Sequence, residues 1–219
     1  MPAYFIVPVI FAVLGYGVLR VALTPVWELG MSAASMVLVE DTPNFYPELM
    51  TIYDPDMEKP EQEQAFIHAE DVVEPKHGEH YGKLTCERIK LNAPVYWGDD
   101  NRILRSGAGQ YEISSLPGYG EAIIICAHNN TFFKPLQKME EGDVITFDTN
   151  YDTYQYRVTE VSVIGEDDLA KRFDSMLGEN KETLLLYTCY PFHAISGRKT
   201  KRLCAFGERI EGADVIWGA

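Results

Sequence analysis

The stretch Thr183-Leu184-Leu185-Leu186-Tyr187-Thr188-Cys189-Tyr190-Pro191 decides the fold of this chain and carries its chemistry. It begins as an apolar run of strand length and ends in one thiol, and the proline that follows stops regular pairing. A residue at the end of a buried strand is held rigidly and can still face a substrate. Cysteine attacks as the thiolate, so it needs a nearby base or cation and donors for the oxyanion. We therefore predict that Cys189 is a nucleophile.

Two further apolar runs end in groups that such a thiol needs. Ile123-Ile124-Ile125-Cys126-Ala127-His128 ends in an imidazole, and Lys201-Arg202-Leu203-Cys204-Ala205-Phe206 carries a guanidinium. His128 is the one histidine of five that ends a core strand, so we predict that it gives and takes the protons. Arg202 is permanently charged and offers several donors, so we predict that it holds the substrate and stabilises the oxyanion.

Three alternatives stay open from the residues alone. His193 follows Cys189 closely and could replace His128, and Arg198 competes with Arg202. Thr188 is predicted to donate to the substrate or to shape the oxyanion site, but it could also be a residue that merely favours the strand. The sequence does not indicate whether the thiol and the imidazole form an ion pair or are both neutral in the resting enzyme.

The three strand-end groups resemble those of the sortases, which are cell-surface cysteine transpeptidases. Leu186-Tyr187-Thr188-Cys189 is similar to the family's Leu-x-Thr-Cys, and Asn92–Gly98 and Leu104–Gly109 are similar to its early segments. The resemblance covers Lys83 to Ile210. Cys189-Tyr190-Pro191-Phe192, followed by Lys201-Arg202, is most similar to class D.

The chain departs from that family pattern at two positions. Ala127 stands where the family usually has glycine before its histidine, and Leu185 stands where a threonine often opens the cysteine motif. Neither change removes a group with a proposed role in the reaction. Both concern the subclass rather than the family.

From Lys83 onward, short apolar runs alternate with turn signals, which predicts a mainly β chain forming a closed barrel or a sandwich. The resemblance implies a closed sortase-type barrel of about eight strands. Short helices are expected at Phe133–Met139 and Asp167–Phe173. Leu104–Gly109 lacks the lysine and hydroxyl residue of a phosphate loop, so we expect a flexible surface turn that could line the peptide groove.

We predict three parts: a transmembrane anchor at 1–27, an acidic extracytoplasmic linker at 28–82 and a catalytic barrel at 83–219. Pro2–Leu19 holds eighteen positions without a charge, and Val21–Trp27 can lengthen that span. The rival interpretation, a cleaved signal peptide, lacks a basic start. Arg20 gives no support for an outside domain, so a single-pass protein with an extracellular catalytic domain is implied by the resemblance alone.

The predicted linker is proline-rich and acidic. Between Glu40 and Glu79 there are twelve acids and two lysines, a net charge of −10 out of −14 for the whole chain. A helix over Glu61–Val73 is one option within it. Asp54-Pro55-Asp56 lacks the aromatic residue of the lid found in some pilus-building sortases, so we expect a solvated tether rather than a lid.

Composition narrows the possible partners and cofactors. A formal charge of −14 disfavours nucleic-acid binding, which needs a basic face. The four cysteines lack C-x-x-C spacing, so Cys86, Cys126 and Cys204 are expected to be buried thiols. A metal site of Cys126, His128, Cys189 and Cys204, or a Cys126–Cys204 disulfide, is the alternative. We expect no metal or cofactor in the reaction, and calcium activation stays open.

The resemblance implies cleavage of a C-terminal Leu-Pro-x-Thr-like sorting signal of secreted proteins. The acyl group would pass to an amine of a peptidoglycan precursor or a pilin. A cell-wall L,D-transpeptidase or a related cell-wall cysteine peptidase is a second possibility, but the expected S-x-G-C motif is absent. A surface binding domain with structural cysteine and histidine is the third.

Overall fold

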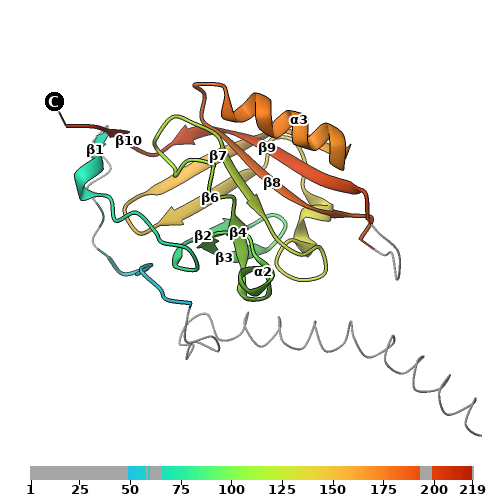
Figure 1. Ribbon diagram of the computed structural model, residues 1–219, viewed down its shortest axis with the longest axis horizontal. Coiled ribbons are helices and arrows are strands. Elements are labelled where there is room, and N and C mark those ends of the chain that lie inside the picture. Colours follow the sequence, from blue (N-terminus) through green and yellow to red (C-terminus); the bar gives the residue numbers. More distant parts are fainter. Residues whose placement is uncertain (1–48, 58, 60–65, 193–198, 219) are drawn as a thin grey trace, which may run out of the picture.

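The computed structural model describes residues 49–57, 59, 66–192 and 199–218. Eight strands close into one barrel in the order β2-β3-β4-β5-β8-β9-β7-β6 (Figure 1). This confirms the predicted mainly β fold with a closed barrel of about eight strands. The barrel strands are β2 (His80–Cys86), β3 (Leu91–Trp97), β4 (Ala108–Gln110), β5 (Ile123–Cys126), β6 (Val144–Thr149), β7 (Thr153–Gly165), β8 (Thr183–Tyr190) and β9 (Lys201–Glu211).

Both faces of β8 are buried. Leu184 and Leu186 belong to the core inside the barrel, whereas Leu185 belongs to a second cluster on its outer surface. The outer cluster includes Leu169 and Met176 of helix α3 (Glu166–Leu177), which lies beside β9 in Figure 1. A strand covered on both faces is apolar without alternation, which explains the continuous leucine run.

The helices agree with the sequence only in part. The two predicted helices are found as a 3-10 helix, η2 (Lys134–Lys138), and as α3. The flexible turn predicted for Leu104–Gly109 is wrong, because helix α2 (Asn101–Ser106) is followed directly by the buried strand β4. The Asp100 carboxylate caps α2 by accepting from the backbone N–H groups of Arg102 (2.7 Å) and Ile103 (3.0 Å).

The described part of the predicted linker packs on the barrel, so the expectation of a solvated tether is wrong for these residues. Strand β1 (Phe66–His68) pairs in parallel with β10 (Asp214–Ile216), and η1 (Ala69–Asp71) is a single 3-10 turn. Ile67 and Val72 join the barrel core. The option of a helix over Glu61–Val73 is therefore wrong for its described part.

The segment around Asp54-Pro55-Asp56 lies against the barrel on the side of β6. The hydroxyl of Tyr53 donates to the carboxylate of Asp148 in β6, three strands away from β8 around the barrel. In the described part of the chain, no helix is long and apolar enough to cross a membrane. The anchor predicted at residues 1–27 lies outside the described residues.

The ring of His80 joins this N-terminal segment to the barrel. Its Nδ1 lies 3.0 Å from the hydroxyl of Thr51 and its Nε2 lies 3.0 Å from the carbonyl oxygen of Gly82. Since a carbonyl only accepts, Nε2 donates to Gly82, and the Thr51 hydroxyl can donate to Nδ1. Tyr53 and Tyr96 pack against the ring. Burial lowers the pKa of His80 to about 4, so the ring is neutral at pH 7.

This neutral histidine makes the fold sensitive to acid. His80 has an ordinary pKa of 6.5 and a folded-state pKa of about 4, so below 6.5 the unfolded chain binds a proton that the folded chain does not. Stability therefore falls as the pH drops from 6.5 towards 4. We expect this group to account for about 1–2 kcal/mol of the loss between pH 7 and 5. In urea unfolding, His80→Gln should lose less stability than the wild type over that interval, and equal losses would contradict the assignment.

Candidate active site

Cys189 lies near the end of β8, on the outer face of the barrel. Because side chains alternate along a strand, Cys189 shares the outward face of Leu185, opposite to that of Leu184 and Leu186. The side chain is half-buried. Its strand is flanked by β5 on one side and by β9 on the other, so two neighbouring strands can present groups to the thiol.

His128 follows β5, which runs parallel to β8. Cys126 lies opposite Tyr187 in this pairing. The pairing ends there, and His128 follows two residues later, directly after Ala127, whose carbonyl oxygen accepts from the hydroxyl of Thr188 in β8. Leu185 and Ile124 face outward, and Cys189 and His128 lie four residues after each of them. Strand alternation therefore leads us to expect the imidazole and the thiol on one face of the barrel.

Side-chain hydrogen bonds hold the two strand ends together. The hydroxyl of Thr188 donates to the carbonyl oxygen of Ala127 (2.6 Å), and the amide of Asn129 donates to the carbonyl oxygens of Cys189 (2.7 Å) and Pro191 (3.3 Å). Thr188 is only 2% exposed, and its hydroxyl is engaged between strands. A direct contact of Thr188 with substrate stays a prediction.

Arg202 reaches the site from the opposite strand. It pairs directly with Cys189 in the antiparallel register of β8 and β9, which puts both side chains on the same face. Its Nη1 donates to the carbonyl oxygens of Lys199 (2.7 Å) and Lys201 (3.0 Å), and its Nη2 donates to Glu166 Oε1 (2.5 Å). These bonds use three of the five N–H groups of the guanidinium.

The structure pairs Cys189 directly with Arg202 across β8 and β9, and His128 comes two residues after the end of β5, the other neighbour of β8. That all three act in one site stays a prediction. A thiol placed between an imidazole and a guanidinium can lose its proton to the first and have its oxyanion products stabilised by the second. The alternatives His193 and Arg198 lie outside the described residues.

Sequence reasoning missed three residues that shape this site. Glu166 holds the guanidinium of Arg202 from the first turn of α3, and Asn129 ties the His128 loop to β8. The ammonium of Lys199 donates to Asn129 Oδ1 (3.3 Å). Asn129 could be seen only as part of a turn, and nothing in the sequence links Glu166 to an arginine 36 positions later.

The other three cysteines are buried thiols. Burial raises the pKa of Cys126 and of Cys204 to about 12, and it also raises the pKa of Cys86. All four cysteines are free. Cys126 and Cys204 both lie opposite Tyr187, on the two sides of β8, so they stand two strand spacings, or about 10 Å, apart. That separation is too long for the alternative disulfide.

The metal alternative finds no support in the geometry. Among the residues that the structure describes, no group of three or more histidine, cysteine, aspartate or glutamate side chains could hold a metal ion. Cys204 packs into the apolar cluster under α3 rather than facing His128.

Comparison with known proteins gives one consistent match. A family model described as a sortase domain matches residues 84–210, a range that includes His128, Cys189 and Arg202. Sortase D of Bacillus subtilis (strain 168) is 29% identical over 136 residues, which cover 62% of this chain and 67% of that protein. This relative agrees with the class D features of the sequence.

Solved structures match over the same region. Sortase C from Clostridium perfringens SM101 superimposes with a TM-score of 0.53 at 28% identity, covering 63% of this chain and 73% of that one. A Clostridium perfringens Sortase D5 transpeptidase gives 0.52 at 25% identity, covering 63% and 82%. Streptococcus pneumoniae Sortase C, described with pilin substrate specificity, gives 0.54 at 28% identity, covering 64% and 74%.

The thiols should differ sharply in reactivity. We expect iodoacetamide at pH 7.5 to label Cys189 first, because Cys126 and Cys204, with pKa values of about 12, are almost wholly protonated there. Peptide mass mapping over time would locate the label. In Cys189→Ala the fast-labelled site should disappear. Labelling of Cys126 at the same rate as Cys189 would contradict the prediction.

Proposed function

This chain belongs to the sortase family and is a cysteine transpeptidase, and from that premise we propose that Cys189, His128 and Arg202 carry the reaction. The observation that supports these roles is the shared register. Cys189 pairs with Arg202 across β8 and β9, and His128 follows the strand that runs parallel to β8 on its other side. This arrangement supports a site in which the three residues, far apart in sequence, act together.

In the first half of the reaction, the sulfur of Cys189 attacks the carbonyl carbon of one amide in a sorting signal. The thiol proton resides on His128 when the sulfur attacks. A carbon–sulfur bond forms and the carbonyl oxygen becomes an oxyanion. The carbon–nitrogen bond then breaks as His128 gives its proton to the leaving amine, so a thioacyl enzyme and a shortened peptide result.

In the second half, an amine attacks the thioacyl carbonyl. His128 takes a proton from the incoming nitrogen, a new carbon–nitrogen bond forms, and the carbon–sulfur bond breaks to release Cys189. The sulfur leaves as a thiolate beside a protonated His128, which is the state from which the sulfur first attacked, so the proton count closes. Water in place of the amine gives hydrolysis.

Arg202 suits the oxyanion and the substrate backbone. A guanidinium keeps its charge at any working pH, and two of its five N–H groups remain beyond the three bonds that Arg202 makes with the described residues. Glu166 and the two backbone carbonyls fix the plane of the group. We therefore propose that Glu166 is a positioning residue that acts through Arg202.

The substrate and the place of action follow from the family. We propose a Leu-Pro-x-Thr-like sorting signal on secreted proteins as acyl donor, and a peptidoglycan precursor or a pilin amine as acceptor. Residues 1–27 would anchor the chain by a single span, with the barrel outside the cell. The uncharged run Pro2–Leu19 and the similarity to Sortase D of Bacillus subtilis support this proposal.

The reaction leaves a covalent trace that tests the assignment of the nucleophile. Incubation with a library of fluorescent pentapeptides should give a thioacyl adduct on Cys189, detected by mass. Cys189→Ala should form none and keep its thermal midpoint, whereas Cys126→Ala should still form it. Arg202→Lys should slow turnover about 10²-fold or more, because an ammonium cannot replace the planar donor pair. Turnover by Cys189→Ala above background would refute the mechanism.

The role of Glu166 has its own signature. Glu166→Gln keeps the size of the side chain and removes the charge that holds Arg202, so we expect turnover to fall about tenfold with little change in thermal midpoint. In an Arg202→Ala background the same change should have no further effect. Glu160→Gln, which breaks the exposed pair with Arg172, is the matched control and should leave turnover unchanged. Additive losses in the double variant would contradict a role through Arg202.

A further inference from the structure

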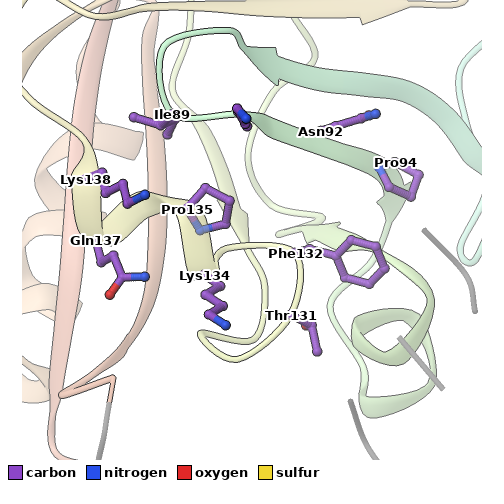
Figure 2. A pocket seen from close by; sticks show the side chains of 10 residues that line it. Ile89, Asn92, Pro94, Thr131, Phe132, Lys134, Pro135, Gln137 and Lys138 are labelled. Carbon is purple, nitrogen blue, oxygen red and sulfur yellow. The ribbon is translucent and has the colours of Figure 1, made fainter. Parts of the chain in front are cut away.

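A cavity of about 360 Å³ lies between the β2–β3 hairpin and the segment that follows His128. Figure 2 shows its two walls: η2 and the loop before it on one side, and the start of β3 on the other. We call it the lysine cavity; it is lined by Ile89, Lys90, Asn92, Pro94, Thr131, Phe132, Lys134, Pro135, Gln137 and Lys138. Nothing in the proposed chemistry uses it.

The lining is positively charged, against the trend of the chain. It contains three lysines and no carboxylate, in a protein of net charge −14. Lys90, Lys134 and Lys138 form no ion pair with any residue that the structure describes. Lys90 also adopts a left-handed backbone with φ of 58°, which is uncommon for a residue other than glycine. Three unneutralised ammonium groups around one hollow favour an anionic ligand.

The rest of the lining is uncharged. Thr131 is 6% exposed and belongs to this lining. Asn92 and Gln137 add side-chain amides to the same lining, while Phe132 and Pro135 add apolar surface. This combination suits a peptide-like anion.

The strand registers fix where the cavity lies relative to the thiol. Extending the β3–β4 and β4–β5 pairings places Pro94 level with His128 and two strand spacings away, about 10 Å. Cys189 lies one spacing further, about 15 Å from Pro94. The cavity is therefore beyond His128, on the side away from Arg202. His128 and Thr131 also belong to one turn, since the N–H of Thr131 bonds the carbonyl oxygen of His128 (3.4 Å).

We propose that the lysine cavity binds a carboxylate carried by the amine acceptor. The inference rests on the proposed function, in which His128 takes a proton from the attacking amine. An acceptor held in the cavity approaches the thioacyl carbon from the His128 side, where that proton must go. The gap of 10–15 Å is that to Pro94, the lining residue located by the strand registers, so at least roughly three extended residues separate the reacting nitrogen from the carboxylate.

The test uses oligoglycine amines of two to seven residues, each with a C-terminal carboxylate or carboxamide. With a fixed acyl donor, the ratio of transfer product to hydrolysis product reports acceptor capture independently of the acylation rate. We expect the carboxylate form to be preferred about tenfold at one or more lengths from three residues upward, and not at two. In Lys134→Gln/Lys138→Gln that preference should fall to about one. Lys171→Gln/Lys181→Gln makes the same charge change on and beside α3 and should keep it.

Equal use of the two acceptor forms at every length by the wild type would overturn the proposal. So would a preference that survives in Lys134→Gln/Lys138→Gln. If no thioacyl adduct forms with any peptide, the proposed function is wrong. The cavity proposal is then tested separately, by measuring whether the acceptor peptide binds. In Cys189→Ala, the amide NMR signals of Thr131 and Lys134 should shift with tetraglycine carboxylate and not with its carboxamide, and no shift would reject the site.

Discussion

The pairing of β8 with β5 on one side and β9 on the other is the constraint on which the site depends. In a strand, a slip of one residue turns every side chain to the opposite face. Such a slip would bury the Cys189 thiol inside the barrel and push Thr188 outward. The register of β8 is fixed because its two apolar faces pack into different clusters. Leu184 and Leu186 pack inside the barrel, and Leu185 packs in the cluster under α3. The packing of three leucines thus orients the nucleophile.

Long apolar runs could be recognised in the sequence, whereas short elements could not. The barrel and the pairing of Cys189 with Arg202 were predictable, because Cys189 ends one long apolar run and Arg202 begins another. Helix α2 and strand β4 were not, since six and three residues are too short for periodicity to register. The N-terminal segment looked like a solvated tether because its few apolar contacts, such as Ile67 and Val72, stand among many acids.

The residues that complete the site were hidden for another reason. Glu166 and Asn129 act through partners that only the closed barrel brings near, namely Arg202 and the backbone at Cys189. No local sequence motif identifies Glu166 or Asn129 as functional. An asparagine in a turn and a glutamate in the first turn of a helix both have ordinary local explanations. Function at such positions becomes visible only from three-dimensional pairing.

The Arg202–Glu166 pair also shows how the fold balances charge against chemistry. Arg202 is 18% exposed, so part of the cost of removing a guanidinium from water must be offset. Glu166 and two backbone carbonyls supply that offset on one edge of the group. The carboxylate lowers the positive potential felt by the thiol, yet it fixes the guanidinium plane. The pair thus fixes the orientation of the Arg202 guanidinium but weakens its electrostatic effect on the thiol. A fixed orientation suits a group that donates hydrogen bonds to a developing oxyanion.

The position of the thiol sets the remaining problem, which is the choice between amine and water. Cys189 sits half-buried on the outer face of the barrel, not in its sealed interior, so a thioacyl group formed there remains within reach of water. Water is at very high concentration and cannot be excluded by position alone. An acceptor gains on water only through a high effective concentration at the reacting carbon. A cation-lined cavity on the His128 side of the site meets that requirement, because it holds the acceptor where its nitrogen meets both the carbon and the base.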